Sequence, residues 1–190
     1  LDFAAGSKPN SLALGDVNGD DVIDIVTANS GSDNVSVLTG VSGGSFSERQ
    51  DFAAGIQPSS VILGDVNGDG FADIVTANSR SEDVSVLTGK GDGSFNAKQD
   101  FHVGLFPESV AIADVDDDDL LDIVTANSGS DDVTLLRGDG LGGFQRFPAQ
   151  LGLYAQIGEG WALRRIVDRT TIAERTDVPD QTLTDLSISH

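Results

Sequence analysis

The 190-residue sequence contains no cysteine and no methionine, and it has only two histidines. The absence of cysteine excludes a disulfide framework, a thiolate nucleophile and a cysteine-based zinc site. No apolar run approaches the roughly 20 residues that span a bilayer, so we expect no membrane insertion. Because the first residue is Leu rather than Met, we expect the chain to be a processed form or a fragment.

Basic residues are also scarce. The chain has 11 Lys plus Arg against 31 Asp plus Glu, which gives a formal net charge of -20. A nucleic-acid binder needs a basic face that displaces counterions from phosphates, so nucleic acid is excluded as a partner. Attraction to an anionic membrane surface is disfavoured for the same reason. Disorder is not implied, because 38% of the residues are apolar and a core of ordinary size is possible.

Arrangements typical of catalysis are missing as well. The histidines are His102 and His190, and neither belongs to a Ser-His-Asp pattern. The glycine-rich turns lack the Gly-Lys-Ser/Thr ending of a phosphate-binding loop. The sequence therefore predicts that the protein is not an enzyme. A formal N-glycosylation sequon begins at Asn34, but a lone sequon inside a repeated strand does not by itself predict modification.

What the sequence does contain is an internal repeat with a period of 49 residues. The string Ile-Val-Thr-Ala-Asn-Ser occurs unchanged at 25–30, 74–79 and 123–128. Single Pro, Gly and Phe residues and an Asp-Phe pair recur at the same step. The repeat divides residues 1–150 into three units, at approximately 1–50, 51–99 and 100–150, and residues 151–190 form a C-terminal extension that does not match them.

Each unit reads as four short strands separated by Gly, Asn and Asp turns. The first strand is predicted at 12–14, 61–63 and 110–112, the second from Asp24, Asp73 and Asp122, the third at 34–37 and 83–86, and the fourth from Phe46, Phe95 and Phe144. A 49-residue unit of four strands is close to one blade of a β-propeller. The predicted fold is all-β, with three tandem four-stranded antiparallel propeller-type blades, about 12 strands, and the extension.

An acidic nine-residue loop lies between the first and second predicted strands of every unit, at 16–24, 65–73 and 114–122. Side-chain oxygens at positions 1, 3, 5 and 9 can converge on one hard cation. The main-chain carbonyl of position 7 is a natural fifth ligand, and water can complete the six to eight oxygens that Ca²⁺ prefers. The sequence therefore predicts three Ca²⁺ sites. Their ligands are Asp16, Asn18, Asp20, Val22 and Asp24; Asp65, Asn67, Asp69, Phe71 and Asp73; and Asp114, Asp116, Asp118, Leu120 and Asp122.

Other interpretations of these loops are weaker. Mg²⁺ demands a tighter octahedron, and an EF-hand needs an acid at position 12, where each unit has a threonine within a strand. Asp, Asn and Gly also favour polar turns without any metal. The third loop argues against that interpretation, because six carboxylates within nine residues would repel one another. This loop has Asp117 and Asp119 where the second has Gly68 and Gly70, so we expect less backbone freedom there.

The run Gly-Asp-Val-Asn-Gly-Asp-Gly-Phe-Ala-Asp-Ile-Val at 64–75, with Gly-Lys-Gly-Asp-Gly-Ser-Phe at 89–95, resembles the FG-GAP or VCBS-type repeat. That family includes the propeller blades of integrin α-subunits and many secreted bacterial repeat proteins. The resemblance covers about 150 of the 190 residues. It implies a four-stranded blade with calcium in the hairpin between its first two strands, and a secreted, extracellular or cell-surface location.

Three predicted blades are fewer than the four to eight of closed propellers. In addition, Leu1–Gly6 matches the end of a fourth strand, as at 50–55 and 100–104, and precedes its own first blade. Either the chain is a piece of a longer propeller or its exposed edges pair with another molecule. Head-to-tail exchange of terminal strands would build a filament.

The extension is less informative. Residues 161–173 fit a short helical stripe or a strand, and 182–188 have partial strand character. We expect the extension to pack on its own repeats or, through its arginines, on a neighbouring protomer.

These observations predict an extracellular, calcium-stabilised structural or adhesive repeat module that mediates protein–protein or surface interactions. One alternative is a subunit of a self-assembling extracellular filament that exchanges terminal strands. Another is a calcium-dependent lectin or an accessory domain of a secreted enzyme. A protein partner or self-association is expected, and a glycan ligand stays open.

Overall fold

The computed structural model describes residues 1–146, 153–157, 160–164, 166–167 and 170–171. Within these residues every regular element is a β-strand and there is no helix, as the sequence predicts. The chain divides into two compact units, Leu1–Phe147 and Pro148–His190. The second contains two antiparallel pairs, β15 (Leu153–Ile157) with β16 (Gly160–Arg164) and β17 (Ile166–Val167) with β18 (Thr170–Thr171). The strand character expected at 182–188 lies outside the described residues.

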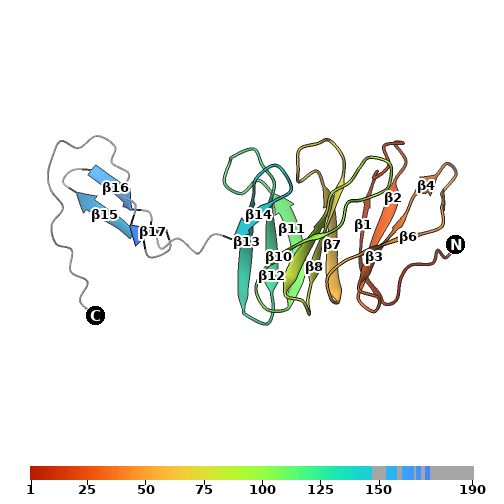
Figure 1. The fold of residues 1–190 in the computed structure, drawn as a ribbon, viewed down its shortest axis with the longest axis horizontal. Coiled ribbons are helices and arrows are strands. Elements are labelled where there is room, and N and C mark those ends of the chain that lie inside the picture. The colour runs from red at the N-terminus through yellow and green to blue at the C-terminus, as the bar shows by residue number, and fades with distance from the viewer. Residues whose placement is uncertain (147–152, 158–159, 165, 168–169, 172–190) are drawn as a thin grey trace. The chain divides into compact units, whose positions relative to one another are not determined.

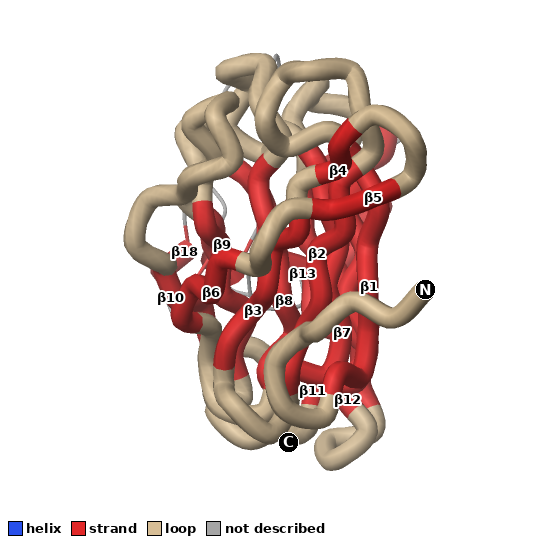
Figure 2. The backbone as a smooth tube through the Cα atoms, turned by 90° about the vertical axis from the view of Figure 1, so that its right-hand side faces the viewer, coloured by secondary structure: helices blue, strands red, loops and turns tan. Residues whose placement is uncertain are grey.

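The first unit contains three four-stranded antiparallel sheets, which lie beside one another in chain order (Figure 1). Sheet 1 consists of β1 (Pro9–Gly15), β2 (Asp24–Asn29), β3 (Asn34–Leu38) and β6 (Gln50–Ala53). Sheet 2 consists of β7 (Pro58–Gly64), β8 (Asp73–Asn78), β9 (Asp83–Leu87) and β10 (Gln99–His102). Sheet 3 consists of β11 (Pro107–Ala113), β12 (Asp122–Asn127), β13 (Asp132–Gly138) and β14 (Phe144–Arg146). Figure 2 shows the loops collected at the two ends of the strands, with the short hairpin of β4 (Gly40–Val41) and β5 (Ser45–Phe46) at one of them.

The repeated Thr-Ala-Asn sequence forms a buried polar network in the second strand of each sheet. In sheet 2, Asn78 Nδ2 donates to Asp83 Oδ1 at 2.8 Å and to Ser85 Oγ at 2.9 Å, while Thr76 Oγ1 donates to Asn78 Oδ1 at 3.0 Å. Ser85 Oγ then donates to Asp100 Oδ1 on the outer strand at 2.7 Å. The equivalent asparagines of sheets 1 and 3 make the same kinds of bonds. Because a buried amide without partners is costly, this network explains why the polar residues recur with the apolar ones.

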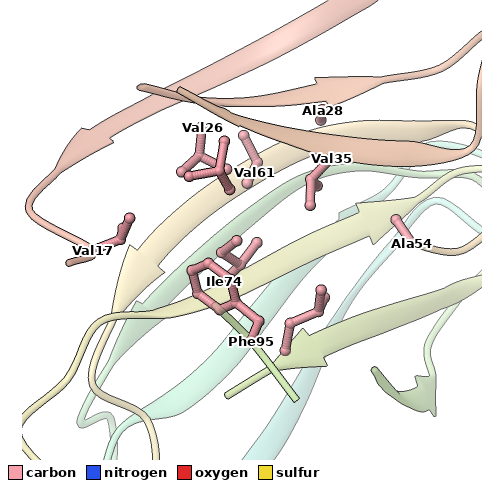
Figure 3. Close-up of a cluster of buried hydrophobic side chains, with 10 residues drawn as sticks. Val17, Val26, Ala28, Val35, Ala54, Val61, Ile74 and Phe95 are labelled. Atoms are coloured by element: carbon pink, nitrogen blue, oxygen red, sulfur yellow. The ribbon is translucent and has the colours of Figure 1, made fainter. Parts of the chain in front are cut away.

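The hydrophobic core lies between neighbouring sheets rather than within one. Figure 3 shows the cluster between sheets 1 and 2, to which both sheets contribute Val17, Val26, Ala28, Val35, Ala54, Val61, Ile74 and Phe95. A second cluster forms in the same way between sheets 2 and 3. Each sheet therefore buries its apolar positions against the next, and β1, β7 and β11 contact one another in turn.

The predicted start of the fourth strand is wrong in the first two sheets. Phe46 pairs with Gly40 in the small hairpin, and Phe95 forms an isolated bridge with Gly89. The strands that complete these sheets, β6 and β10, begin four residues later. The reason is that Phe46 and Phe95 close the short hairpin that follows the third strand, and pairing with the third strand resumes only at Gln50 and Gln99. In sheet 3 the strand does begin at Phe144, as predicted.

Candidate metal centre

The fifteen predicted ligand residues lie in three equivalent places. In each sheet they occupy the loop between the first and second strands, and the ninth residue begins the second strand as Asp24, Asp73 or Asp122. The register of each strand pair fixes this geometry, because Gly15 pairs with Asp24 and Gly64 pairs with Asp73.

The first aspartate of the loop is surrounded by backbone N–H groups. Asp65 Oδ1 accepts from Gly68 N at 2.8 Å and from Asp69 N at 3.1 Å, and its Oδ2 accepts one further backbone N–H. Asp16 is bound in the same way, and the backbone N–H of Asp21 contributes most to lowering the pKa of Asp16. The loop thus folds around the carboxylate of its first aspartate, and Oδ2 keeps a lone pair that a cation could use.

The ninth aspartate fixes the loop to the neighbouring hairpin. Asp73 is fully buried, its Oδ2 accepts from Val66 N at 2.9 Å, and its Oδ1 accepts from Gly89 N at 2.8 Å. Burial raises the pKa of Asp73, against the opposing effect of these two N–H groups. Position 89 requires glycine, since a Cβ there would collide with the carbonyl oxygen of Ala72. Asp24 and Asp122 make the equivalent pairs of bonds.

Positions 3 and 5 carry the remaining predicted side-chain ligands. In the second loop, Asn67 Oδ1 accepts from Asp69 N at 3.0 Å, and Asn67 Nδ2 donates to Asp69 Oδ2 at 2.9 Å. Asp69 Oδ1 accepts from Phe71 N at 2.9 Å. The first loop repeats these bonds through Asn18 and Asp20. In both loops position 3 is therefore a neutral amide bonded to its neighbour.

All three loops adopt the same backbone turn, including the one that lacks glycine. Positions 4 and 6 have positive φ everywhere: 74° and 86° at Gly68 and Gly70, and 59° and 64° at Asp117 and Asp119. In the first loop, position 6 is Asp21 with φ 62°. Aspartate tolerates the left-handed region better than most residues but at a cost that glycine avoids. The third loop therefore reaches the shared conformation with more strain.

The third loop brings three carboxylates together. Oxygens of Asp114, Asp116 and Asp122 all lie within 4.8 Å of one another, the one such carboxylate group among the described residues. Ligands on opposite sides of a Ca²⁺ ion are about 4.6–5.2 Å apart, because each oxygen lies about 2.3–2.6 Å from the ion. Asp116 Oδ1 is buried and accepts no hydrogen bond from a described residue. These residues fit a bound divalent cation.

An arginine accompanies this cluster. Arg137 Nη1 lies 2.9 Å from Asp116 Oδ2. Partial burial raises the pKa of Asp116, Arg137 opposes that change, and the carboxylates of the loop reinforce it. Sequence reasoning missed Arg137, although a signal was available: the corresponding positions of the other two units are Thr39 and Thr88.

Not every predicted ligand joins the cluster. Asp118 lies outside the group of three, and its Oδ1 accepts from Leu120 N at 2.9 Å. Coordination by the main-chain carbonyls of Val22, Phe71 and Leu120 stays a prediction. So do the complete ligand sets of the first two loops.

Comparison with known proteins identifies the repeat. A family model described as an FG-GAP-like repeat matches residues 16–76 and again 65–125, so that each match begins at the first aspartate of an acidic loop and extends into the next unit. A search of curated proteins gives no match.

The described residues also contain no helix that is long and apolar enough to cross a membrane.

Proposed function

Because the two matches together span 16–125, more than half of the chain, the chain belongs to the FG-GAP-like repeat family, and on this basis we propose that it is an extracellular protein-interaction module whose acidic loops bind Ca²⁺. FG-GAP repeats are generally extracellular protein-interaction modules. The role proposed for this chain is structural or adhesive binding rather than catalysis. Calcium is proposed to stabilise the fold and not to take part in a reaction.

One observation carries the calcium proposal: the Asp114, Asp116 and Asp122 cluster with its buried, unbonded Oδ1 atom. Three carboxylates this close repel one another in a partly buried setting, and Arg137 supplies only one compensating charge. A divalent cation would supply two more. The first two loops have the same backbone turn and the same anchoring of positions 1 and 9, which supports sites there as well.

The ion would stabilise the protein by joining elements that are otherwise held by single hydrogen bonds. Position 9 already contacts the following hairpin through Gly40, Gly89 or Gly138. A cation bound at this carboxylate would offset its repulsion by the other carboxylates of the loop. An ion that binds the folded state alone adds about 2.7 kcal/mol per site when its concentration is 100 times Kd. Extracellular modules of this kind use millimolar calcium.

Thermal unfolding in Ca²⁺, in Mg²⁺ and in EDTA at matched ionic strength tests the proposal. Each filled site should raise Tm by roughly 5–10 °C, from about 2.7 kcal/mol per site and the usual temperature dependence for a unit of this size. Mg²⁺ should have a much smaller effect. Asp65→Asn and Asp114→Asn should each remove part of the calcium-dependent increase, whereas Glu48→Gln, an exposed acid outside the loops, should leave it intact. The same Tm in all three solutions would refute calcium stabilisation.

A further inference from the structure

The two outer faces of the three-sheet unit expose residues that are buried wherever two sheets meet inside it. On the face of sheet 1 that lies away from sheet 2, Leu12 is 60% exposed, whereas its equivalents Val61 and Val110 are 6% and 7% exposed. On the opposite face, Val133 of sheet 3 is 67% exposed, whereas its equivalents Val35 and Val84 are fully buried. These two faces are the two halves of an interface that the chain already forms twice.

The N-terminal segment reproduces half of that interface. Phe3 contacts Phe46 edge-on with ring centroids 5.0 Å apart, and the internal pairs Phe52–Phe95 and Phe101–Phe144 have the same geometry at 5.2 and 5.3 Å. The backbone continues the match: Lys8 O accepts from Ser30 N at 3.0 Å, and residues 57 and 106 accept the equivalent bonds. Figure 1 shows this segment beside sheet 1, on the side away from sheet 2. Residues 1–8 thus lie where the outer strand of a preceding sheet would run.

Among the described residues, sheet 3 has an outer strand along only part of its edge. In sheets 1 and 2, the first residues of the third strand pair with β6 and β10. In sheet 3, β14 pairs only with the end of β13, at 136–138, so 132–135 pair with β12 on one side but have no strand partner on their outer side among the described residues. The side chains show the same difference: Ser36 and Ser85 donate to Asp51 and Asp100 at 2.7 Å. The buried hydroxyl of Thr134 accepts two hydrogen bonds but has no such carboxylate beside it in the described part of the chain.

The sequence that forms this outer strand in sheet 1 also occurs at the N-terminus of the chain. The outer strand of sheet 1 and the residues that follow it read Asp-Phe-Ala-Ala-Gly at 51–55, and the same five residues stand at 2–6. The positions after sheet 3 that correspond by the period of 49 are 149–153, which read Ala-Gln-Leu-Gly-Leu and provide neither the aspartate nor the phenylalanine.

From these observations we propose that the partner of this surface is a second copy of the chain, docked head to tail. Asp2–Ala4 of one copy pairs with Asp132–Thr134 of the other in the register of the internal sheets, so that Phe3 lies opposite Val133. The carboxylate of Asp2 accepts the hydroxyl hydrogen of Thr134. Leu12 and Leu14 of sheet 1, both exposed, cover Val133 and its apolar neighbours on sheet 3.

This contact is heterologous, because two different faces meet. It forms a closed ring if the rotation between copies returns to its start and an open filament if it does not. Two copies contribute six sheets, within the four to eight of closed propellers. The contact does not depend on calcium for its geometry, but Ca²⁺ in three loops would change the formal net charge from -20 to -14 and so weaken the repulsion between copies.

Sedimentation of the full chain over a range of concentrations, with Ca²⁺ present, tests the proposal. A discrete dimer or a growing polymer would support it. Val133→Lys and Leu12→Lys should each weaken association at least tenfold, because they place a charge at the centre of the contact. Leu141→Lys, which alters an 83% exposed residue in the hairpin of sheet 3, is the matched control and should associate normally. A strict monomer at high concentration, with Tm raised by calcium, would overturn the docking and leave the calcium proposal standing.

Cross-linking tests the register itself. Because the chain has no native cysteine, only the introduced cysteines can form a disulfide. Val37 pairs with Gln50 and Val86 pairs with Gln99, which places Leu135 of one copy opposite Leu1 of the other. A mixture of the Leu1→Cys and Leu135→Cys variants should form a mixed disulfide dimer under mild oxidation. A mixture of Leu1→Cys with Leu141→Cys should not. Equal yields from both mixtures would contradict the proposed register.

Discussion

Sheets 2 and 3 are built from nearly the same inner strands, yet they differ at two places. Sheet 2 lies between two neighbours, is completed by β10, and turns its acidic loop with Gly68 and Gly70. In sheet 3, 132–135 have no strand partner on their outer side among the described residues, and the acidic loop turns with aspartates. The comparison shows that the repeat specifies a common backbone, whereas burial and strain depend on what surrounds each copy.

The largest difference between sheets 2 and 3 should be the stability lost when the equivalent valines of their third strands, Val84 and Val133, are truncated. Val84→Ala should lower the free energy of unfolding by about 2 kcal/mol, from the lost transfer free energy and the cavity left behind. Val133→Ala should change it by less than about 0.5 kcal/mol, because the side chain already faces solvent. Urea unfolding at a protein concentration too low for association measures both. Equal losses for the two variants would show that Val133 is covered within a single chain.

A smaller difference is expected from the turns of the acidic loops. Gly70→Ala should destabilise the second loop by about 1 kcal/mol, since a methyl group has space there but φ is positive. Asp119→Gly should stabilise the third loop by roughly 0.5 kcal/mol, less than the cost at position 70 because aspartate tolerates this region. Both values come from urea unfolding in EDTA. A destabilised Asp119→Gly variant would mean that the Asp119 carboxylate makes a stabilising interaction that outweighs the strain of its positive φ.

The sequence predicts this common backbone well. The 49-residue period locates the second strands, and the Asp and Gly spacing locates the three loops, because both depend on local turn chemistry and on alternation within a strand. Sequence-based prediction fails where pairing and contacts between different elements of one unit decide the structure. Phe46 looks like the start of the outer strand but pairs with Gly40 in the short hairpin, and the third strand pairs with Gln50–Ala53 instead. The only sequence signal for the Arg137 contact with Asp116 is the arginine itself, which stands where the other two units have Thr39 and Thr88, because the two partners lie on different elements.

The smallest effect should be an opposite pH dependence of two loops in calcium-free protein. Asp116 has a raised pKa when folded, so its contribution to stability grows as pH falls through that pKa and is complete below the ordinary value of 3.8. Asp16 has a lowered pKa, so its contribution is present above 3.8 and is lost as pH falls through the folded pKa. Unfolding in EDTA between about pH 6 and pH 3 measures both, with Asp116→Asn and Asp16→Asn removing one dependence each. Identical slopes for the two variants would contradict the assigned directions.

The most direct test of the calcium account is the number of ions bound per chain. Equilibrium dialysis against millimolar Ca²⁺, followed by metal analysis of the protein, measures it without reference to stability or association. We expect three Ca²⁺ per chain, and two when Asp16, Asp65 or Asp114 is changed singly to Asn. A wild-type chain that retains no Ca²⁺ above the dialysis buffer would contradict it.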